Sequence, residues 1–330
     1  MKTKPTISIV IPCYNEERTI TSLLDAIYSQ NIDLNSIEVI IADGLSTDKT
    51  RGLIEEFVLT HPNLEVIVID NENRVIPYGL NKAIRSARGE IIIRMDAHAI
   101  PAKDYAAKSV AELREGKGDN VGGVIDILPG GNGAIAKAIA IATAHPLGVG
   151  DAMYRWATKA GTADTVAFGC FFKSTIEKVG YFNETLKANE DYEFNVRLRK
   201  LGFKIWIDPG IRAVYYSRAT LRSLSRQYFL YGFWKVKMLR MFPKTIRWRQ
   251  ALPPLFVLGN LMILLLSVFW FPAIWFFIAV ILVYLLILTI GSVKPALKQK
   301  NCALVVGIPL AIATMHFSWG SGFLVSLLKK

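Results

Sequence analysis

Near its N-terminus the chain reads Ile7-Ser8-Ile9-Val10-Ile11-Pro12-Cys13-Tyr14-Asn15-Glu16-Glu17, an apolar run that stops abruptly at polar residues. Consecutive Val and Ile residues are typical of a strand that is buried on both faces, as in a parallel sheet. Similar Val- and Ile-rich runs return at residues 37–42, 64–69 and 90–95. This opening stretch therefore predicts the first strand of a repeated unit.

Amphipathic segments fill the intervals between these four runs. They cover residues 16–30, 47–60 and 77–87, and the last of them ends at Arg88-Gly89, which is a helix stop signal. Alternating strands and helices predict an α/β fold with a mostly parallel sheet and helices on both faces. Ligands of such sheets bind beyond the carboxyl ends of the strands, so the polar residues there are candidates for a functional site.

Acidic residues follow three of the four runs directly. Glu16 comes after the first run, Asp43 after the second and Asp96-Ala97-His98 after the fourth. The side chains of Asp96 and His98 can both turn toward one divalent cation, and an oxygen and nitrogen pair favours Mn²⁺ over Mg²⁺. Further along, Asn189-Glu190-Asp191 begins a predicted helix. Taken singly, each of these groups is as well explained by a helix cap or a turn.

The charge of the chain changes sharply after Asp208. The 330 residues include 39 basic and 27 acidic side chains, for a formal net charge of +12. Residues 209–330 hold 15 of the basic residues and no acidic residue, and they are strongly apolar. This combination is typical of a protein that meets anionic lipids, and the excess charge does not imply a nucleic-acid partner. The three cysteines are too few and too scattered for a disulfide framework.

A long uncharged segment predicts a membrane domain. Residues 250–293 contain 44 residues and no charge, enough helix to cross a ~30 Å hydrocarbon core twice. We predict two spans at residues 252–271 and 273–290, joined at Pro272, and residues 303–328 form a third candidate that either spans or re-enters. Lysines and arginines on both sides of the pair place those loops in the cytosol by the positive-inside rule.

A basic amphipathic segment precedes the spans. On a helical wheel of residues 220–242 the apolar side chains share one face and the basic ones another, although Lys235 falls on the apolar side and Gly232 weakens the helix. The pattern indicates a helix in the membrane interface or, alternatively, a basic helix packed on the N-terminal domain. The predicted domains are a cytosolic domain at 1–212, a basic interface segment at 213–250 and a membrane domain at 251–330.

As an ordered set, the motifs resemble the family 2 glycosyltransferases, which have the GT-A fold and use nucleotide sugars. The resemblance covers about residues 5–210 and is carried by residues 9–17, 42–50, 88–98, 180–182 and 189–191. More narrowly, residues 94–98 and 227–232, followed by apolar helices, are similar to bacterial exopolysaccharide glucosyltransferases of the succinoglycan ExoA type. The resemblance implies a GT-A nucleotide-sugar-binding fold, followed by an interfacial amphipathic helix and C-terminal transmembrane helices.

The resemblance also implies a role for each candidate residue. Asp191, of the catalytic pair Glu190-Asp191, would take the proton from the acceptor hydroxyl in a single inverting displacement. Asp96 and His98 would hold Mn²⁺ or Mg²⁺ on the donor diphosphate, and Asp43 would accept a hydrogen bond from the nucleobase. The other expected nucleotide-sugar contacts are Pro12, Tyr14, Glu16 and Arg74. The expected contacts to the acceptor or to a lipid diphosphate are Arg222, Arg226 and Gln227.

The implied reaction is transfer of a sugar, expected to be glucose from a UDP-sugar, to a lipid-linked saccharide in extracellular or capsular polysaccharide synthesis. His98 replaces the second aspartate of the family's D-x-D motif. Leu230 and Tyr231 stand where processive synthases have Arg and Trp, so one sugar is expected per encounter. The expected location is the cytoplasmic membrane, as a multi-pass protein with its catalytic domain in the cytosol.

Two alternatives remain open. One is a polyprenyl-phosphate glycosyltransferase, whose acceptor is the bare lipid phosphate, and the other is a catalytically silent membrane protein that binds nucleotide. A dinucleotide-dependent oxidoreductase is excluded because no G-x-G-x-x-G follows the first apolar run.

Overall fold

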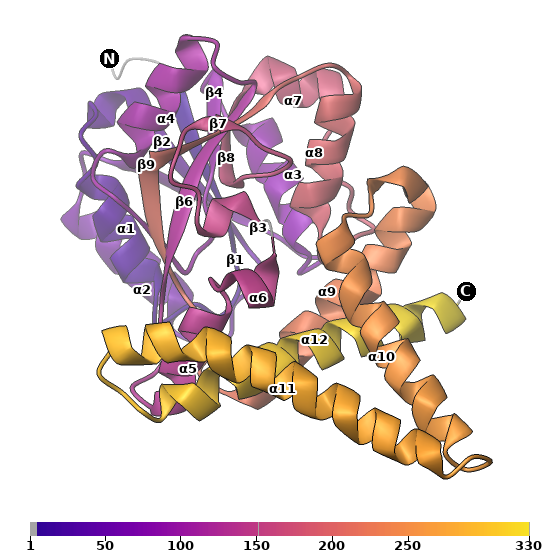
Figure 1. Cartoon of the computed structure of the whole chain (residues 1–330). Coiled ribbons are helices and arrows are strands. Elements are labelled where there is room, and N and C mark those ends of the chain that lie inside the picture. Colours follow the sequence, from indigo (N-terminus) through magenta and orange to yellow (C-terminus); the bar gives the residue numbers. More distant parts are fainter. Residues whose placement is uncertain (1–4, 151, 330) are drawn as a thin grey trace. The chain divides into compact units, whose positions relative to one another are not determined.

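A computed structural model describes residues 5–150 and 152–329 of the chain. The chain divides into two compact units (Figure 1). The first contains the residues up to Asp126 and Met153–Tyr215, and the second contains Ile127–Ala152 and the residues from Tyr216 on. Residues 127–152, which interrupt the first unit in the sequence, therefore belong to the second unit.

A mixed sheet organises the first unit. Its strand order is β3-β2-β1-β4-β8-β6-β9-β5, and β7 pairs with β9. The first four strands in this order are parallel: β3 (Glu65–Asp70), β2 (Ile37–Asp43), β1 (Ile7–Cys13) and β4 (Ile91–Arg94). They coincide with the four apolar runs, which confirms the four predicted parallel strands. β1, β2 and β4 are buried as predicted, whereas β3 lies at the edge of the sheet and is only partly buried, with Val68 39% exposed.

The other half of the sheet contains antiparallel pairs. β8 (Ala167–Phe172) runs antiparallel to β4 on one side and to β6 (Asn120–Leu128) on the other. β9 (Ile205–Tyr216) runs antiparallel to both β5 (Ala99–Pro101) and β7 (Gly161–Thr162). The parallel half thus presents the carboxyl ends of β1, β2 and β4 at one edge, where the predicted polar residues lie.

Helices cover both faces of this sheet (Figure 1). They are α1 (Ile20–Tyr28), α2 (Thr50–Thr60), α3 (Ile76–Ser86), α4 (Tyr105–Arg114), α7 (Lys173–Val179) and α8 (Glu190–Lys200), with short 3₁₀ turns η1 (Leu34–Ser36) and η2 (Met153–Arg155). The helices predicted after β1 and β2 are present but begin later than expected, at Ile20 and Thr50.

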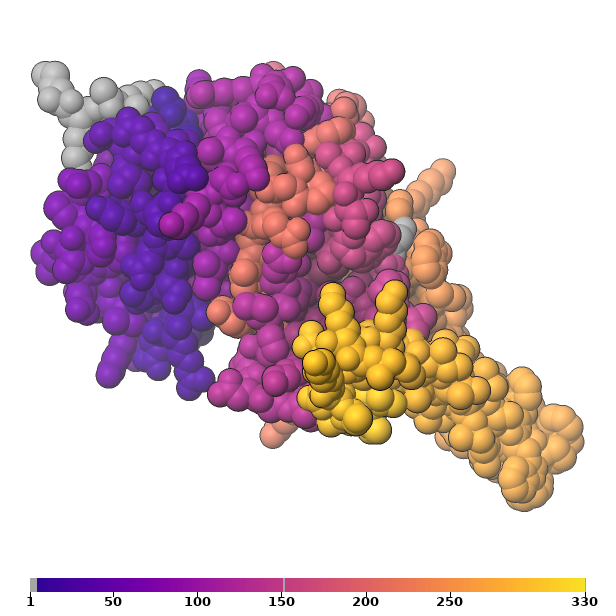
Figure 2. Space-filling model, turned by 60° about the vertical axis from the view of Figure 1, so that its left-hand side comes forward, coloured from indigo at the N-terminus to yellow at the C-terminus, as the bar shows by residue number. Residues whose placement is uncertain are grey.

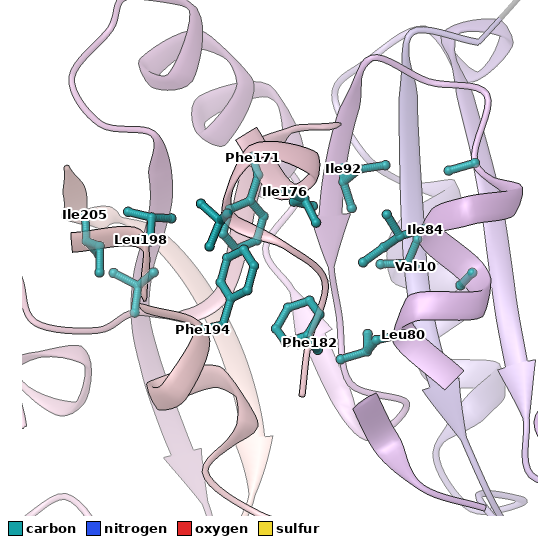
Figure 3. Packing of buried hydrophobic residues seen from close by; sticks show 14 of the residues in the cluster. Val10, Leu80, Ile84, Ile92, Phe171, Ile176, Phe182, Phe194, Leu198 and Ile205 are labelled. Atoms are coloured by element: carbon teal, nitrogen blue, oxygen red, sulfur yellow. The ribbon is translucent and has the colours of Figure 1, made fainter. Parts of the chain in front are cut away.

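One apolar cluster joins α3 and α8 to the sheet. It includes Val10 of β1, Leu80 of α3 and Phe194 of α8, all buried (Figure 3). The rings of Phe182 and Phe194 stack with centroids 4.6 Å apart. This packing fixes α8 against the sheet and so determines where its first turn, Glu190 and Asp191, is held.

The second unit is helical. Its elements are α5 (Ala134–Ala142), α6 (Pro146–Val149), α9 (Leu221–Met241), η3 (Pro243–Thr245), α10 (Trp248–Leu266), α11 (Pro272–Lys298) and α12 (Leu304–Leu328). Among the described residues, α10, α11 and α12 are long and apolar enough to cross a membrane. In Figure 2 the hairpin of α10 and α11 forms the orange part of the second unit.

The predicted membrane spans differ from the helices at their ends. The first predicted span, 252–271, ends at Leu266, and residues 267–271 form the turn. Pro272 begins α11, where its missing N–H leaves no hydrogen bond unmade. α11 also continues past the predicted end at residue 290 to Lys298.

The predicted amphipathic helix is present as α9, and it packs along α12. Lys235, which the helical wheel places on the apolar side, is fully buried, with its Nζ atom 3.4 Å from Sδ of Met238. The apolar face of α9 therefore includes a helix–helix contact that the sequence pattern did not reveal.

Candidate functional site

Hydrogen bonds join the loops that follow β1 and β2. The backbone N–H of Asn15 donates to Oγ of Ser46 (2.8 Å), and Oδ1 of Asn15 accepts from the backbone N–H of Thr47 (2.9 Å). The backbone N–H of Glu16 donates to Oγ1 of Thr50 (2.8 Å). These bonds explain why α1 and α2 begin late, because the residues before them form one joined loop at the carboxyl edge of the sheet.

Asp43 supports this loop from beneath. Its carboxylate is fully buried and accepts hydrogen bonds from Oγ and the backbone N–H of Ser46 (2.5 and 3.0 Å) and from Nε of Arg51 (2.5 Å). Arg51 also pairs with Asp70 at the end of β3 (2.5 Å). A hydrogen bond from a nucleobase to the Asp43 carboxylate stays a prediction, and the contacts in the structure show Asp43 holding the loop in place.

Tyr14 and Arg74, both predicted nucleotide contacts, lie together. The Arg74 guanidinium lies 5.4 Å from the centroid of the Tyr14 ring, and Tyr14 is 44% exposed. Pro12, a third predicted contact, is half-buried at the end of β1. An exposed aromatic ring beside a cation offers a stacking surface and a positive charge, which suit a nucleobase and a phosphate.

Arg94 connects the Asp96 strand end to α8. Its Nη2 atom lies 3.3 Å from Oδ1 of Asp96 and 3.0 Å from Oε1 of Glu190, and the residue is 8% exposed. Burial alone would lower the pKa of Arg94, but the negative charges of Asp96, Glu190 and Asp191 together raise it. Arg94 therefore stays a cation and holds two predicted site residues together.

Glu190 and Asp191 form the first turn of α8, after Asn189 in the left-handed conformation (φ 64°). Glu190 is buried. Burial raises the pKa of Glu190 to about 7, and the charge of Asp191 adds to this effect while Arg94 opposes it. Asp191 is half-buried and lines a small pocket with Arg94 and Phe182. Of the two acids, Asp191 is therefore the one that can meet a substrate.

Asp96 and His98 are the candidate metal ligands, one through a carboxylate oxygen and the other through a ring nitrogen. Nδ1 of His98 lies 3.0 Å from Oε1 of Glu16, and the side chains of Asp96 and His98 are 25% and 30% exposed. Across residues 5–150 and 152–329, no group of three or more His, Cys, Asp or Glu side chains is placed to hold a metal. Two accessible ligands fit a Mg²⁺ or Mn²⁺ site that is completed by phosphate oxygens and water.

The contact of Glu16 with a base or ribose stays a prediction, and the structure shows two other contacts of its carboxylate. The resemblance places it beside the base and ribose, and in the structure its carboxylate contacts His98 and accepts a hydrogen bond from Oγ1 of Thr19 (2.7 Å). The contact between Glu16 and His98 was not predicted, and neither was the Arg94 bridge to Glu190.

The predicted acceptor contacts belong to the second unit. Arg222 and Arg226 are exposed on α9, and Nε2 of Gln227 donates to the hydroxyl of Tyr231 (2.9 Å). Their contact with an acceptor stays a prediction.

Known proteins resemble this chain over most of its length. It is 30% identical over 331 residues to the dolichyl N-acetyl-alpha-D-glucosaminyl phosphate 3-beta-D-2,3-diacetamido-2,3-dideoxy-beta-D-glucuronosyltransferase of Methanococcus voltae, covering 98% of this chain and 97% of the relative. It is 32% identical over 247 residues to the succinoglycan biosynthesis protein ExoA of Rhizobium meliloti, covering 74% and 73%.

Solved structures share the fold. A mannosyltransferase from Pyrobaculum calidifontis, in complex with GDP-Man and Mn²⁺, gives a TM-score of 0.66 at 20% identity over 99% of this chain and 88% of that one. This likeness shows the GT-A fold, as predicted. The model of glycosyl transferase family 2 matches residues 8–180. Together with the two relatives, this match shows that the chain belongs to the family 2 glycosyltransferases.

Proposed function

We propose that the chain is an inverting, metal-dependent enzyme that moves one sugar per encounter from a nucleotide sugar to a lipid-linked saccharide. The Arg94 bridge carries this proposal. It holds Asp96, expected at the donor diphosphate, beside the Glu190-Asp191 turn, expected at the acceptor hydroxyl. Bringing the groups that act on donor and acceptor into one fixed arrangement is the main way such an enzyme lowers its barrier.

The donor end would be formed by the joined loops after β1 and β2. The ring of Tyr14 would stack on the base and Arg74 would meet a phosphate, while Asp43 and Arg51 keep the loop in shape. We expect a UDP-sugar, with glucose as the sugar. Nucleotide-sugar use is the chemistry of the family, and the Pyrobaculum neighbour was solved with GDP-Man.

Asp96 and His98 would hold the divalent metal, Mn²⁺ or Mg²⁺. When bound, the metal would offset the charge that develops on the leaving diphosphate. Glu16 accepts or shares a proton at Nδ1 of His98 and so orients the ring, as partners of metal-ligating histidines commonly do.

Asp191 would act as the general base. The acceptor oxygen attacks the anomeric carbon, the bond from that carbon to the diphosphate oxygen breaks, and the hydroxyl proton passes to the Asp191 carboxylate. One in-line displacement inverts the carbon. Glu190 is buried against Arg94, so its role is to hold the cation and the turn.

The acceptor is expected to be lipid-linked. The Methanococcus relative is named for transfer to a dolichyl-linked sugar phosphate, which supports a polyprenyl-linked saccharide, and the Rhizobium relative is named for polysaccharide synthesis. The apolar helices α10 and α11 would anchor the enzyme, and Lys244, Lys298 and Lys300 would keep the catalytic unit on the cytosolic side.

The test is an incubation of membranes containing the enzyme with a panel of radiolabelled nucleotide sugars, with and without a chelator. We expect one donor to label an extractable lipid saccharide, loss of labelling with the chelator, and recovery when Mn²⁺ is added back. Labelling of bare polyprenyl phosphate would establish the rival acceptor. Nucleotide binding without labelling by any donor would contradict the enzymatic proposal.

A further inference from the structure

We propose that α12 does not cross the membrane. It lies beside α9 in one leaflet, so the chain crosses only twice, through α10 and α11, and both ends of the chain are on the side of the catalytic unit. By length and composition α12 qualifies as a span, yet 44% of its most apolar window is buried, against 11% in α11. The partners of α12 explain this difference.

The second half of α12 pairs with α9 in the same direction. Oγ of Ser318 lies 2.9 Å from Oγ of Ser225 near the start of the contact. At its end, the guanidinium of Arg240 donates to the backbone carbonyls of Ser326 (3.1 Å) and Lys329 (2.7 Å). The two helices therefore run side by side to the end of α12.

Two glycines bring the backbones of α9 and α12 into close contact. A Cβ atom on Gly232 would lie 2.1 Å from the carbonyl oxygen of Trp319, and one on Gly322 would lie 2.1 Å from that of Phe229. Only glycine fits such an approach, which is how small residues let helices pack closely. The depth of α12 in the bilayer is therefore tied to that of α9.

α9 cannot occupy the hydrocarbon core. Its 21 residues include Arg222, Arg226, Lys235, Lys237 and Arg240, and charged side chains at the centre of a spanning helix strongly oppose its insertion. Arg222 and Arg226 are exposed. A helix of this composition lies in the interface plane, where its basic groups reach the headgroups.

The first half of α12 is held by a segment of the second unit that is joined in sequence to the first unit on both sides. A Cβ on Gly307 would lie 2.8 Å from Cβ of Ala138 in α5, and Gly148 of α6 packs against Met315. Residues 127–152, which contain α5 and α6, are joined to the first unit at both ends. α5 has 9 residues and a length of about 13 Å, less than half of a ~30 Å core. This half of α12 is therefore also kept on the catalytic side.

The turn of the α10–α11 hairpin is exposed and apolar, in contrast to the packed helix α12. Val268, Phe269 and Phe271 in this turn are 76%, 89% and 70% exposed, so the hairpin ends in exposed apolar side chains that suit contact with lipid. α12, by contrast, has lysines at both ends, Lys298 and Lys300 before it and Lys329 after it. By the positive-inside rule, lysines at both ends of α12 favour keeping both ends on the cytosolic side, so the charges do not favour a crossing by α12.

The partner of the α9–α12 layer is thus the lipid leaflet on the catalytic side. Exposed Val306, Leu310 and Leu327 of α12 would contact the acyl chains, and Arg222 and Arg226 of α9 the anionic headgroups. This inference concerns topology and does not depend on which sugar is transferred.

The test of sidedness uses the full-length chain with one epitope tag at each end. Right-side-out and inside-out vesicles are treated with a membrane-impermeant protease, and both tags are followed by immunoblot. We expect both tags to be removed in the same vesicle preparation and both to be protected in the other. Removal of the two tags in opposite preparations means three crossings and would overturn the proposal.

A second measurement tests the pairing itself. Ser225→Cys and Ser318→Cys are combined with Cys302→Ser, since Cys13 and Cys170 are buried. Mild oxidation in membranes should link the new cysteines, as read by peptide mapping without reduction. The control pair, Ser225→Cys with Ser267→Cys in the α10–α11 turn, should not link. If the cysteines at 225 and 318 do not link, or if the control pair links with equal yield, α9 and α12 are not paired as proposed.

Discussion

Arg94 is a buried side chain on which both halves of the proposed chemistry depend. One of its nitrogens reaches Asp96 and Glu190, which lie far apart in the sequence. A guanidinium suits such a bridge because it stays charged and because Nη2 carries two N–H donors, one for each carboxylate. The sequence predicted Asp96, His98 and Asp191 as candidates because each follows a recognisable strand or helix boundary. It did not reveal the bridge, because a contact between distant segments leaves no local pattern.

Replacement of Arg94 by lysine should separate positioning from binding. Lysine keeps the charge, but its ammonium is a compact group on a flexible stem and does not reproduce the fixed geometry of Nη2, so Asp96 and the Glu190 turn lose their common support. We expect kcat to fall by about 10–100-fold with little change in the affinity for the nucleotide, measured by initial rates and by calorimetry with UDP. Arg74→Lys is the matched comparison and should raise the donor KM instead. A wild-type kcat in Arg94→Lys would refute the bridge's role.

Protonation of Glu190 should make kcat fall on the acid side of the pH profile, near neutral pH. Its pKa is raised to about 7, so it is ionised and paired with Arg94 above that pH and neutral below it. We therefore expect kcat to decline as the pH falls through about 7, in a kcat–pH profile from pH 5.5 to 9. In Glu190→Gln this decline should be absent, with activity near the low-pH level of the wild type. An unchanged decline in Glu190→Gln would assign the titration to another group.

At the scale of elements, the sequence predicted the type and order of the structure better than its ends. Runs of Val and Ile placed β1 to β4 correctly, because strands buried on both faces, such as β1, β2 and β4, have an unmistakable composition. β3 has the same composition but is only partly buried at the edge of the sheet, which the composition did not reveal. The starts of α1 and α2 were predicted too early, since Asn15, Glu16 and Thr47 use their polar groups to join two loops. Such bonds between loops depend on the sheet having formed and cannot be seen in local propensity.

Glu38 should be a main contributor to stability among the strand residues. Its buried carboxylate on β2 accepts hydrogen bonds from Oγ of Ser8 (2.6 Å) and from the backbone N–H and Nε of Arg88 (2.6 and 2.8 Å). Burial alone would raise the pKa of Glu38, but these bonds outweigh it and hold the pKa below the usual value of 4.5. Its stabilisation is therefore present above about pH 4.5 and is lost as the pH falls through the lower, folded-state pKa.

We expect Glu38→Gln to lower the free energy of unfolding by about 1–3 kcal/mol at pH 7, and the difference from wild type to shrink under acid. Thermal unfolding of the detergent-solubilised enzyme between pH 3.5 and 7 measures this. Glu65→Gln is the matched control, because Glu65 pairs with the same Arg88 but is partly exposed, and it should cost less than about 1 kcal/mol. Equal losses from the two variants would show that burial of Glu38 adds nothing.

At the scale of the whole molecule, the charge change after Asp208 predicted a membrane-associated half, and three apolar helices agree with it. The sequence could not show that residues 127–152 join that half. Small apolar residues such as those of α5 suit a soluble core and a helix bundle equally well. The partner of α5 becomes visible only where Gly307 of α12 meets Ala138.

The basic face of α9 should matter only for acceptors in a membrane. Arg222 and Arg226 are exposed, whereas Arg240 holds the end of α12 and is better left intact. Each exposed arginine near anionic lipid contributes about 1 kcal/mol at low salt. Arg222→Gln with Arg226→Gln should therefore cut transfer to a lipid-linked acceptor by about tenfold or more, with the loss fading at high salt. An equal loss with a water-soluble acceptor would contradict this role.

The assignment of Asp191 as the base is the centre of the account, and one measurement tests it most directly. Sugar transfer is followed with the donor identified by the panel, comparing wild type with Asp191→Asn, while nucleotide binding is measured on the same preparations. We predict that kcat falls by about 10²–10⁴-fold with the nucleotide affinity retained, because only the proton acceptor is lost. Full transfer activity in Asp191→Asn would contradict the account.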